Sequence, residues 1–388
     1  MRCATRAALL VPAVLAAANL AFSAENPGVT AAPVLQVPLG SRALGMGTAY
    51  TAVASDSSGL SYNPAGLARL NAHETGFTYI VGAGESQIQH LTYGGPTPLS
   101  GISGNGYTSV GASLLYSQSG TIELNRLNTD GSLQSSQNLS AGSDLVASFG
   151  YAERVGMTPI DLRDASFGID HFLGIGGKYV RSTLVESYSA STFAGDIGYL
   201  VACPDVGWSF AASGLNLGGR LKYVEQGDPL PATVRSGIAW QGGVPSVHNV
   251  VAAVDGDYVL DERLWHVNAG VEYFWLKSYG FRLGYQFHHA DSAGLTTGFG
   301  LRWKGRVLFD YAWALGDTFG NAHRFTVTYR FGGVPPSVRG RQRRPFIEAR
   351  PERRQMEGLD EKQPTVEDVP RPRAVPRDRP QGVPGWIY

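Results

Sequence analysis

The sequence is poor in charge, in cysteine and in long apolar runs. Only 16% of its 388 residues are charged, and Lys plus Arg balance Asp plus Glu at 32 each. A soluble domain usually carries about 25% charged residues, so this surface faces something besides water. A neutral chain also lacks the basic footprint of nucleic-acid-binding proteins. Fifty glycines and eighteen tyrosines, beside four methionines, favour strands and tight turns over helices.

Residues 1–24 have the pattern of a secretory signal peptide. Two arginines precede a short apolar stretch from Ala7 to Leu20, and small residues suited to cleavage follow it. The stretch is too short for a membrane helix, which needs about 20 apolar residues, and no other window is long enough. Cys3 precedes the stretch, which argues against a lipoprotein, and removal of the peptide leaves Cys203 alone. The mature chain therefore has no disulfide of its own, and no role for Cys203 is indicated.

Residues 332–388 have a different composition, with eleven arginines, ten prolines and eight acidic residues. With Lys362 their net charge is +4, twelve basic minus eight acidic side chains. Such a segment cannot bury enough apolar surface to offset its chain entropy, so we predict a disordered tail. Its apolar end, Val383 to Tyr388, is either a short docking motif or an unstructured terminus.

Apolar and polar residues alternate through the C-terminal half of the body. From Tyr279 to His288, large apolar residues fill the odd positions, and glycine or polar residues fill the even ones. The pattern recurs over 295–303 and 307–315. Alternation over about ten residues is typical of a strand with one apolar face.

A soluble sandwich also alternates, but three features favour a membrane barrel. Strands of about ten residues match a tilted crossing, aromatic residues lie near the strand ends, and the chain has an export signal. The last strand resembles the terminal strand by which outer-membrane barrels are recognised for assembly. Because backbone groups in hydrocarbon need partners, the strands must close into a barrel. The alternate apolar residues of the last strand are Phe325, Val327, Tyr329 and Phe331.

We therefore predict an all-β fold, an antiparallel transmembrane β-barrel of about 14 strands over 73–331. It would lie in the outer membrane of a Gram-negative-type bacterium. An even strand number puts both termini and the tail on the periplasmic side, and the polar loop 120–140 outside. The predicted strands are 73–81, 86–94, 106–118, 141–153, 169–183, 189–202, 207–215, 230–241, 247–260, 264–276, 279–289, 292–303, 305–315 and 323–331.

Residues 25–72 precede the first strand and have no strand period. Most of this segment is rich in small residues and nearly uncharged, so it cannot lie in lipid but can pack inside a barrel. Glycine permits close backbone approach, the run 49–54 is compatible with one short helix, and the proline fixes a bend that the preceding asparagine braces. The segment is either a plug without a ligand role or part of a binding site. Its motif residues are Gly45, Met46, Gly47, Asp56, Asn63, Pro64, Ala65 and Gly66.

These motifs resemble the PorV/PorQ family of outer-membrane proteins and, more distantly, FadL-type transporters of long-chain fatty acids and aromatic hydrocarbons. Each matching piece is short, but their order and spacing over about 35–331 are specific. The matches are Gly40–Gly47, Asp56, Asn63–Leu67, Leu215–Gly218, Leu221–Tyr223, Gly227–Pro231, Gly294–Arg302 and Asp310–Phe325.

The resemblance implies a fourteen-stranded barrel whose N-terminal segment plugs the lumen. In FadL-type members the plug borders an apolar pocket, and substrate leaves sideways through the wall. PorV-like members instead escort exported cargo at the cell surface. The tail after Phe331 departs from the family pattern and indicates a periplasmic partner.

The polar faces of the late strands would project into the lumen. They form either a scaffold of paired charges or a polar path that cradles an anionic head group. The residues are Glu272, Arg282, Gln286, Arg302, Asp310, Arg324 and Arg330.

The sequence argues against an enzyme. The candidates Asp170–His171, His288–Asp291 and Ser209 lie in no nucleophile elbow, and adjacent strand residues point to opposite faces. The glycines after Leu173 introduce no helix, which disfavours a nucleotide site. We predict no cofactor and no metal site.

Two functions remain. The barrel either passes hydrophobic or amphipathic small molecules, or it is a non-transporting escort or scaffold subunit of a secretion or surface-assembly system that binds a partner through its tail. An apolar pocket beneath the plug favours the first function, and a lumen filled with paired charges favours the second. The plug motif favours the transporter.

Overall fold

A computed structural model of the chain describes residues 28–82, 86–104, 108–161, 166–185, 187–244, 247–287, 292–316 and 321–333. The chain divides into two compact units, 1–346 and 347–388, and every described residue belongs to the first. The predicted signal peptide and all but two residues of the predicted tail lie outside the described residues, so both stay predictions.

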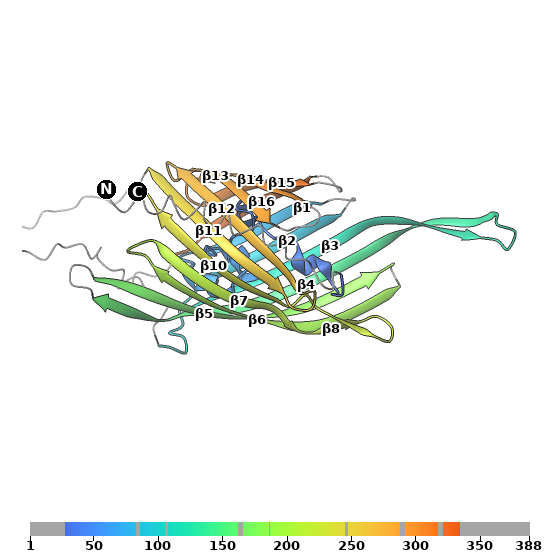
Figure 1. The fold of residues 1–388 in the computed structure, drawn as a ribbon, viewed down its shortest axis with the longest axis horizontal. Helices are drawn as coiled ribbons and strands as arrows, with labels where there is room; N and C mark the ends of the chain where they lie inside the picture. Colours follow the sequence, from blue (N-terminus) through green and yellow to red (C-terminus); the bar gives the residue numbers. More distant parts are fainter. Residues whose placement is uncertain are drawn as a thin grey trace, which may run out of the picture. The chain divides into compact units, whose positions relative to one another are not determined.

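The described residues form a closed antiparallel barrel of fourteen strands (Figure 1). Neighbouring strands pair in chain order, and β1 pairs with β16 to close the ring, with His73 opposite Phe331. This confirms the predicted fold class. The barrel strands are β1 His73–Val81, β2 Gln87–Thr97, β3 Thr108–Leu127, β4 Leu133–Asp161, β5 Ser166–Leu184, β6 Tyr188–Cys203, β7 Trp208–Gly218, β10 Thr233–Gly242, β11 His248–Val259, β12 Leu264–Trp275, β13 Tyr279–Phe287, β14 Ser292–Trp303, β15 Val307–Gly316 and β16 Ala322–Phe331.

The two barrel ends differ. We call the end where β1 begins and β16 ends the proximal end, and the opposite one the distal end. A long hairpin of β3 and β4 extends at the distal end (Figure 1). Between β7 and β10, a small hairpin of β8 Arg220–Lys222 and β9 Gly227–Pro229 forms a separate two-stranded sheet.

Residues 120–140 were predicted to form a polar loop, and this prediction is wrong. β3 and β4 remain paired from Ser119 opposite Gly142 out to Leu127 opposite Leu133. The hairpin turns at Asn128, whose N–H donates to the Ser132 carbonyl at 2.8 Å, with Gly131 at a φ of 83°. The polar composition misled the prediction, because a two-stranded ribbon in water satisfies its ladder without an apolar face.

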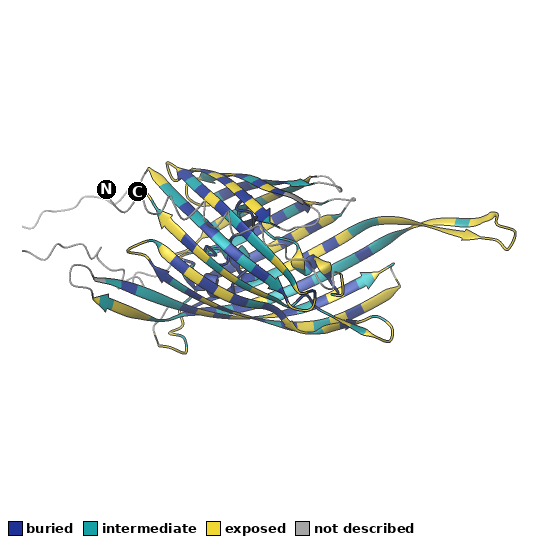
Figure 2. Cartoon of the chain, viewed as in Figure 1, coloured by how far each residue is buried: buried dark blue, intermediate teal, exposed yellow. Residues whose placement is uncertain are grey.

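The faces of the strands alternate as predicted (Figure 2). On β13, Leu283 is 59% exposed while its neighbour Arg282 is 4% exposed. On β16, the predicted assembly residues Phe325, Val327, Tyr329 and Phe331 are all exposed. The outer face is thus a band of apolar side chains. Among the described helices, none has the length and apolarity needed to cross a membrane.

The N-terminal segment, residues 28–72, contains one short α-helix, α3 Ser41–Gly45, and three 3₁₀ turns, η1 Pro33–Gln36, η2 Ser57–Ser61 and η3 Pro64–Arg69. The helix considered at 49–54 is absent from these described residues. The backbone N–H groups of Tyr50 and Thr51 donate instead to the Asp255 carboxylate on β11, at 2.7 Å each. The Ala54 N–H donates to the Tyr50 carbonyl at 2.8 Å, so the run makes a single turn, and the wall carboxylate accepts from first-turn N–H groups that have no partner within a helix.

The segment runs from one end of the barrel to the other. Near its start, the Ala31 N–H donates to the Pro229 carbonyl at 2.8 Å, and Gln36 donates to Glu262 in the distal β11–β12 turn at 2.9 Å. It ends at His73 on the proximal end. The first barrel strand begins and the last barrel strand ends at the proximal end, as the even strand number predicts. The first described residues of the segment lie at the distal end.

A charge on the apolar outer face tests the membrane placement. Leu283→Lys should destabilise the barrel in phospholipid vesicles by about 2–4 kcal/mol, because a lysine near the midplane has no water. Asn125→Lys, on the exposed distal hairpin, is the matched control and should have little effect. Urea unfolding in vesicles measures both. Equal effects of the two substitutions would contradict the placement.

Candidate functional site

Glycines on both partners allow the N-terminal segment to approach the wall closely. A Cβ added to Gly284 on β13 would lie 2.0 Å from the Gly47 backbone nitrogen, and one added to Gly270 on β12 would lie 2.2 Å from the Met46 carbonyl oxygen. A Cβ added to Gly45 would lie 3.2 Å from the Cβ of Arg282 on β13. The predicted glycine motif therefore packs directly on the backbone of the wall.

The Asn63 motif makes the corresponding contact on the opposite wall. The Asn63 side chain accepts from the Ala65 N–H at 3.0 Å and donates to the Thr51 and Tyr199 carbonyls at 3.2 and 3.3 Å. Pro64 begins η3. Strand glycines face the motif, and a Cβ on Gly198 would lie 2.0 Å from Asn63 Oδ1. The asparagine thus braces a turn and also ties it to β6.

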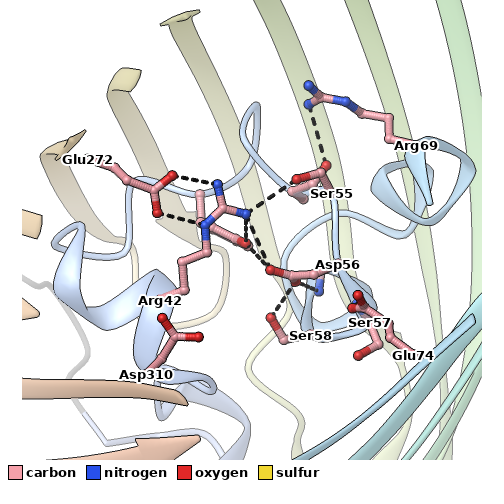
Figure 3. Close-up of polar contacts among 12 residues, drawn as sticks. Arg42, Ser55, Asp56, Ser57, Ser58, Arg69, Glu74, Glu272 and Asp310 are labelled. Atoms are coloured by element: carbon pink, nitrogen blue, oxygen red, sulfur yellow. Dashed lines mark hydrogen bonds and ion pairs between the residues drawn. The ribbon is translucent and has the colours of Figure 1, made fainter. Parts of the chain in front are cut away.

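An ion-pair network joins α3 to the wall (Figure 3). Arg42 donates through Nε and Nη2 to both Glu272 oxygens, each at 2.8 Å. Glu272 also accepts from Arg282 Nε at 2.7 Å, and Arg282 pairs with Asp310 at 2.7 Å. Three of the predicted lumen residues, Glu272, Arg282 and Asp310, are thus brought together. Arg42 lies within the Gly40–Gly47 match of the sequence analysis, which assigned it no role.

Asp56 ties the other side of Arg42 to the segment itself. Its carboxylate lies 3.4 Å from Arg42 Nη1, caps η2 by accepting from the Gly59 N–H at 3.2 Å, and accepts from the Ser58 and Tyr50 hydroxyls. Burial alone would raise the pKa of Asp56, but Arg42 and the two hydroxyl donors bring this pKa below its ordinary value. Because the folded pKa is depressed, the stabilisation is present above the ordinary carboxyl pKa and is lost as the pH falls through the lowered one.

Other buried charges pair between neighbouring wall strands, and two of these pairs were not predicted. Lys178 on β5 lies 3.0 Å from Asp196 on β6, and Arg235 on β10 lies 3.0 Å from Asp257 on β11. Arg330, named in the sequence analysis, pairs with buried Glu74 at 2.9 Å. The sequence contains a signal that could have identified these residues as inward-facing, since they occupy the inward positions of strands with alternating faces.

The remaining predicted lumen residues have weaker partners. Gln286 donates to the Thr48 hydroxyl at 3.4 Å. The Arg302 guanidinium stacks on the Phe274 ring at 3.9 Å. Arg324 is 5% exposed, and its Nε and Nη1 have no hydrogen-bond partner among the described residues.

Among the cavities lined by the described residues, two lie between the segment and the wall. The first, of about 390 Å³, lies toward the distal end beneath residues 34–39. The second, of about 320 Å³, lies toward the proximal end beside Arg42. Residues 48–62 contribute to the walls of both, so the N-terminal segment separates them.

The enzyme candidates that the structure describes have separate partners. Asp170 pairs with Arg154 at 2.6 Å, whereas His171 contacts the Tyr199 hydroxyl at 2.6 Å. Ser209 donates to the Ala52 carbonyl at 3.0 Å. Positions 288–291 lie outside the described residues, and so do their candidate His288 and Asp291. Within the described ranges, no group of three His, Cys, Asp or Glu residues is arranged to hold a metal, and Cys203 is buried.

Comparisons with known proteins give one family match and several structural similarities. A model described as "Uncharacterised protein family (UPF0164)" matches residues 10–140. No curated protein matches the chain. The PorV/PorQ resemblance stays a prediction.

The similar solved structures include two toluene transporters. TbuX of Ralstonia pickettii has a TM-score of 0.47 and 14% identity, covering 76% of this chain and 98% of its own. TodX of Pseudomonas putida has a TM-score of 0.47 and 14% identity, covering 80% and 98%. A Pseudomonas aeruginosa FadL homologue has a TM-score of 0.39 and 9% identity, covering 76% and 99%.

The glycine contact predicts a position-specific cost. Gly284→Ala should destabilise the folded barrel by about 1–3 kcal/mol or more, because the new methyl group overlaps the Gly47 backbone. Gly177→Ala on β5 is the matched control, since a Cβ there meets nothing within 4 Å. Urea unfolding of both variants in vesicles measures the difference. If they unfold alike, the segment does not pack as described.

Proposed function

We propose that the chain is an outer-membrane barrel that binds amphipathic or hydrophobic small molecules and passes them across the membrane, with the N-terminal segment as its plug. The apolar outer band supports the membrane placement. The single observation that carries the small-molecule role is the first cavity. Its volume of about 390 Å³ lies within the range of small-molecule sites, about 300–1,000 Å³.

The lining of the first cavity suits an amphipathic ligand. Apolar side chains come from the N-terminal segment at Val34, Leu35 and Val37, and from the wall at Leu115 and Val146. Apolar walls with a few convergent polar groups are typical of small-molecule sites.

The polar part of that lining includes an unsatisfied group. His90 on β2 is 1% exposed, and both of its ring nitrogens have no hydrogen-bond partner among the described residues. Lys178 and Asn216, which bond to one another at 2.7 Å, line the same cavity. A buried polar group without a partner costs free energy, so a ligand with one hydrogen-bonding group would be stabilised at His90.

The plug role is supported by the contacts of the segment. It reaches both ends of the barrel and is held by Arg42–Glu272 and by the two backbone donors to Asp255. A solute that passes from one cavity to the other must therefore move part of residues 48–62 or skirt them. We take the proximal end as periplasmic, so the tail after Phe331 would begin in the periplasm.

The escort or scaffold alternative draws support from a different feature. Paired charges join the N-terminal segment to the wall and nearby wall strands to one another: Arg42 with Glu272, Arg282 with Asp310, and Arg235 with Asp257. Such pairing stabilises a barrel that need not open. In this alternative the tail binds a protein of a secretion or surface-assembly system.

Native mass spectrometry of the full chain, extracted from membranes in mild detergent, separates the two functions. The wild type should carry a small amphiphile, and Val146→Trp should bind it more weakly or lose it, because the indole takes up part of the first cavity. Val271→Trp, on the outward face of β12, is the matched control and should keep it. Deletion of 334–388 should leave the ligand in place.

Two outcomes would contradict the transporter. One is retention of the same ligand in Val146→Trp to the same extent as in the wild type. The other is a wild-type chain with no small molecule and a co-purifying protein that disappears with the tail, which would make the barrel an assembly subunit.

A further inference from the structure

The second cavity has a different chemistry from the first. It lies toward the proximal end, and Gln241, an exposed residue near the end of β10, forms part of its wall. Among the described residues, four arginines from four separate elements and one carboxylate line this cavity. The arginines are Arg42 on α3, Arg69 on η3, Arg302 on β14 and Arg330 on β16, and the carboxylate is Glu272 on β12.

The carboxylates near this cavity already accept hydrogen bonds from arginines. Glu272 accepts two hydrogen bonds from Arg42 and one from Arg282, each at 2.7–2.8 Å. Glu74 accepts from Arg330 at 2.9 Å. Arg42 and Arg330 are thus neutralised within the protein.

The other two guanidinium groups are not neutralised. Arg69 donates only through Nη1, to the Ala52 and Ala54 carbonyls at 3.2 and 3.5 Å, in the part of the chain that the structure describes. Arg302 stacks one face on Phe274 at 3.9 Å, and its buried Nε has no hydrogen-bond partner among the described residues. Neither lies within 4.0 Å of a described carboxylate.

Uncompensated guanidinium groups in a half-enclosed cavity are costly, and their remaining N–H donors match one ligand chemistry. Guanidinium forks bind carboxylate and phosphate oxygens through paired, charge-assisted hydrogen bonds. Stacking on an aromatic ring leaves the edge of Arg302 free to donate. A neutral apolar solute would leave both charges unpaired.

We infer that the second cavity is a binding site for an oxyanion, a phosphate or carboxylate group, held by Arg69 and Arg302. The site joins a residue of the N-terminal segment to a residue of the wall, so a bound anion bridges the two. It does not depend on the small-molecule role of the first cavity. The anion is either free in solution or the head group of an amphiphile inside the barrel.

The test is isothermal titration of the full-length barrel in zwitterionic detergent, with inorganic phosphate, acetate and octanoate as probes. The wild type should bind at least one of them, more weakly at high salt. The double variant Arg69→Gln/Arg302→Gln should bind about tenfold more weakly or not at all. Arg220→Gln, on the exposed β8 hairpin, removes a charge elsewhere and should bind as the wild type does.

The same probes separate the sources of the anion. Tighter binding of octanoate than of acetate means an amphiphile head group, whereas phosphate and acetate binding without dependence on chain length means a free anion. Val146→Trp should retain oxyanion binding, so failure of the proposed transport role remains distinguishable from failure of this site.

A second measurement keeps the inference testable if the double variant does not fold. Phenylglyoxal modifies accessible guanidinium groups, and mass spectrometry reads the modified residues in the wild type. Phosphate or octanoate should protect Arg69 and Arg302 but not Arg220. The site is excluded if no probe binds, if the double variant binds as tightly as the wild type, or if neither arginine is protected.

Discussion

The bidentate pair between Arg42 and Glu272 is the interaction on which the interior depends. A wide barrel must fill its lumen, and here the N-terminal segment lies in the lumen, where it buries apolar side chains such as Met46, Tyr50 and Leu67. Arg42 reaches a wall carboxylate on one side and Asp56 on the other. Removing one partner of a buried pair leaves the other charge uncompensated, at a cost of about 3–5 kcal/mol. The pair thereby fixes where α3 lies, and the glycine contacts at Gly47 follow from that position.

Much of the barrel was predictable because alternation is a local signal. The apolar positions of 279–287 and 323–331 identify strands and faces without knowledge of any partner, and the register agrees with them. The hairpin at 120–140 was not predictable in this way. Polar residues dominate it and its few apolar residues, such as Ile122 opposite Leu139, are too sparse to make a strand signal, so pairing there rests on the Asn128–Ser132 turn and on the ladder below it.

The interior was predictable in composition but not in geometry. Small residues at 45–47 and the Asn63–Pro64 turn indicated close packing inside the barrel. Which strand each would meet depends on the register of strands that are distant in the sequence, 136 residues for Asn63 and Tyr199 and 205 residues for Tyr50 and Asp255. The expected helix at 49–54 is a single turn, in which the Ala54 N–H donates to the Tyr50 carbonyl while a distant carboxylate accepts from the first N–H groups. The lumen charges were assigned to the correct face of their strands. Which arginines have a carboxylate partner and which do not can be decided only when their neighbours in the folded chain are known.

The segment divides the lumen into two environments with opposite preferences. Toward the distal end, apolar side chains around Val146 line a space together with His90 and the paired charges of Arg235 and Asp257. Toward the proximal end, Arg69 and Arg302 leave positive charge uncompensated. On the two proposals above, an apolar solute would be stabilised in the first space and a small inorganic anion in the second, whereas a molecule with an apolar body and one anionic group would be stabilised in both. Since residues 48–62 line both cavities, such a molecule would contact the same segment on either side of it, which would give that segment a direct part in selection.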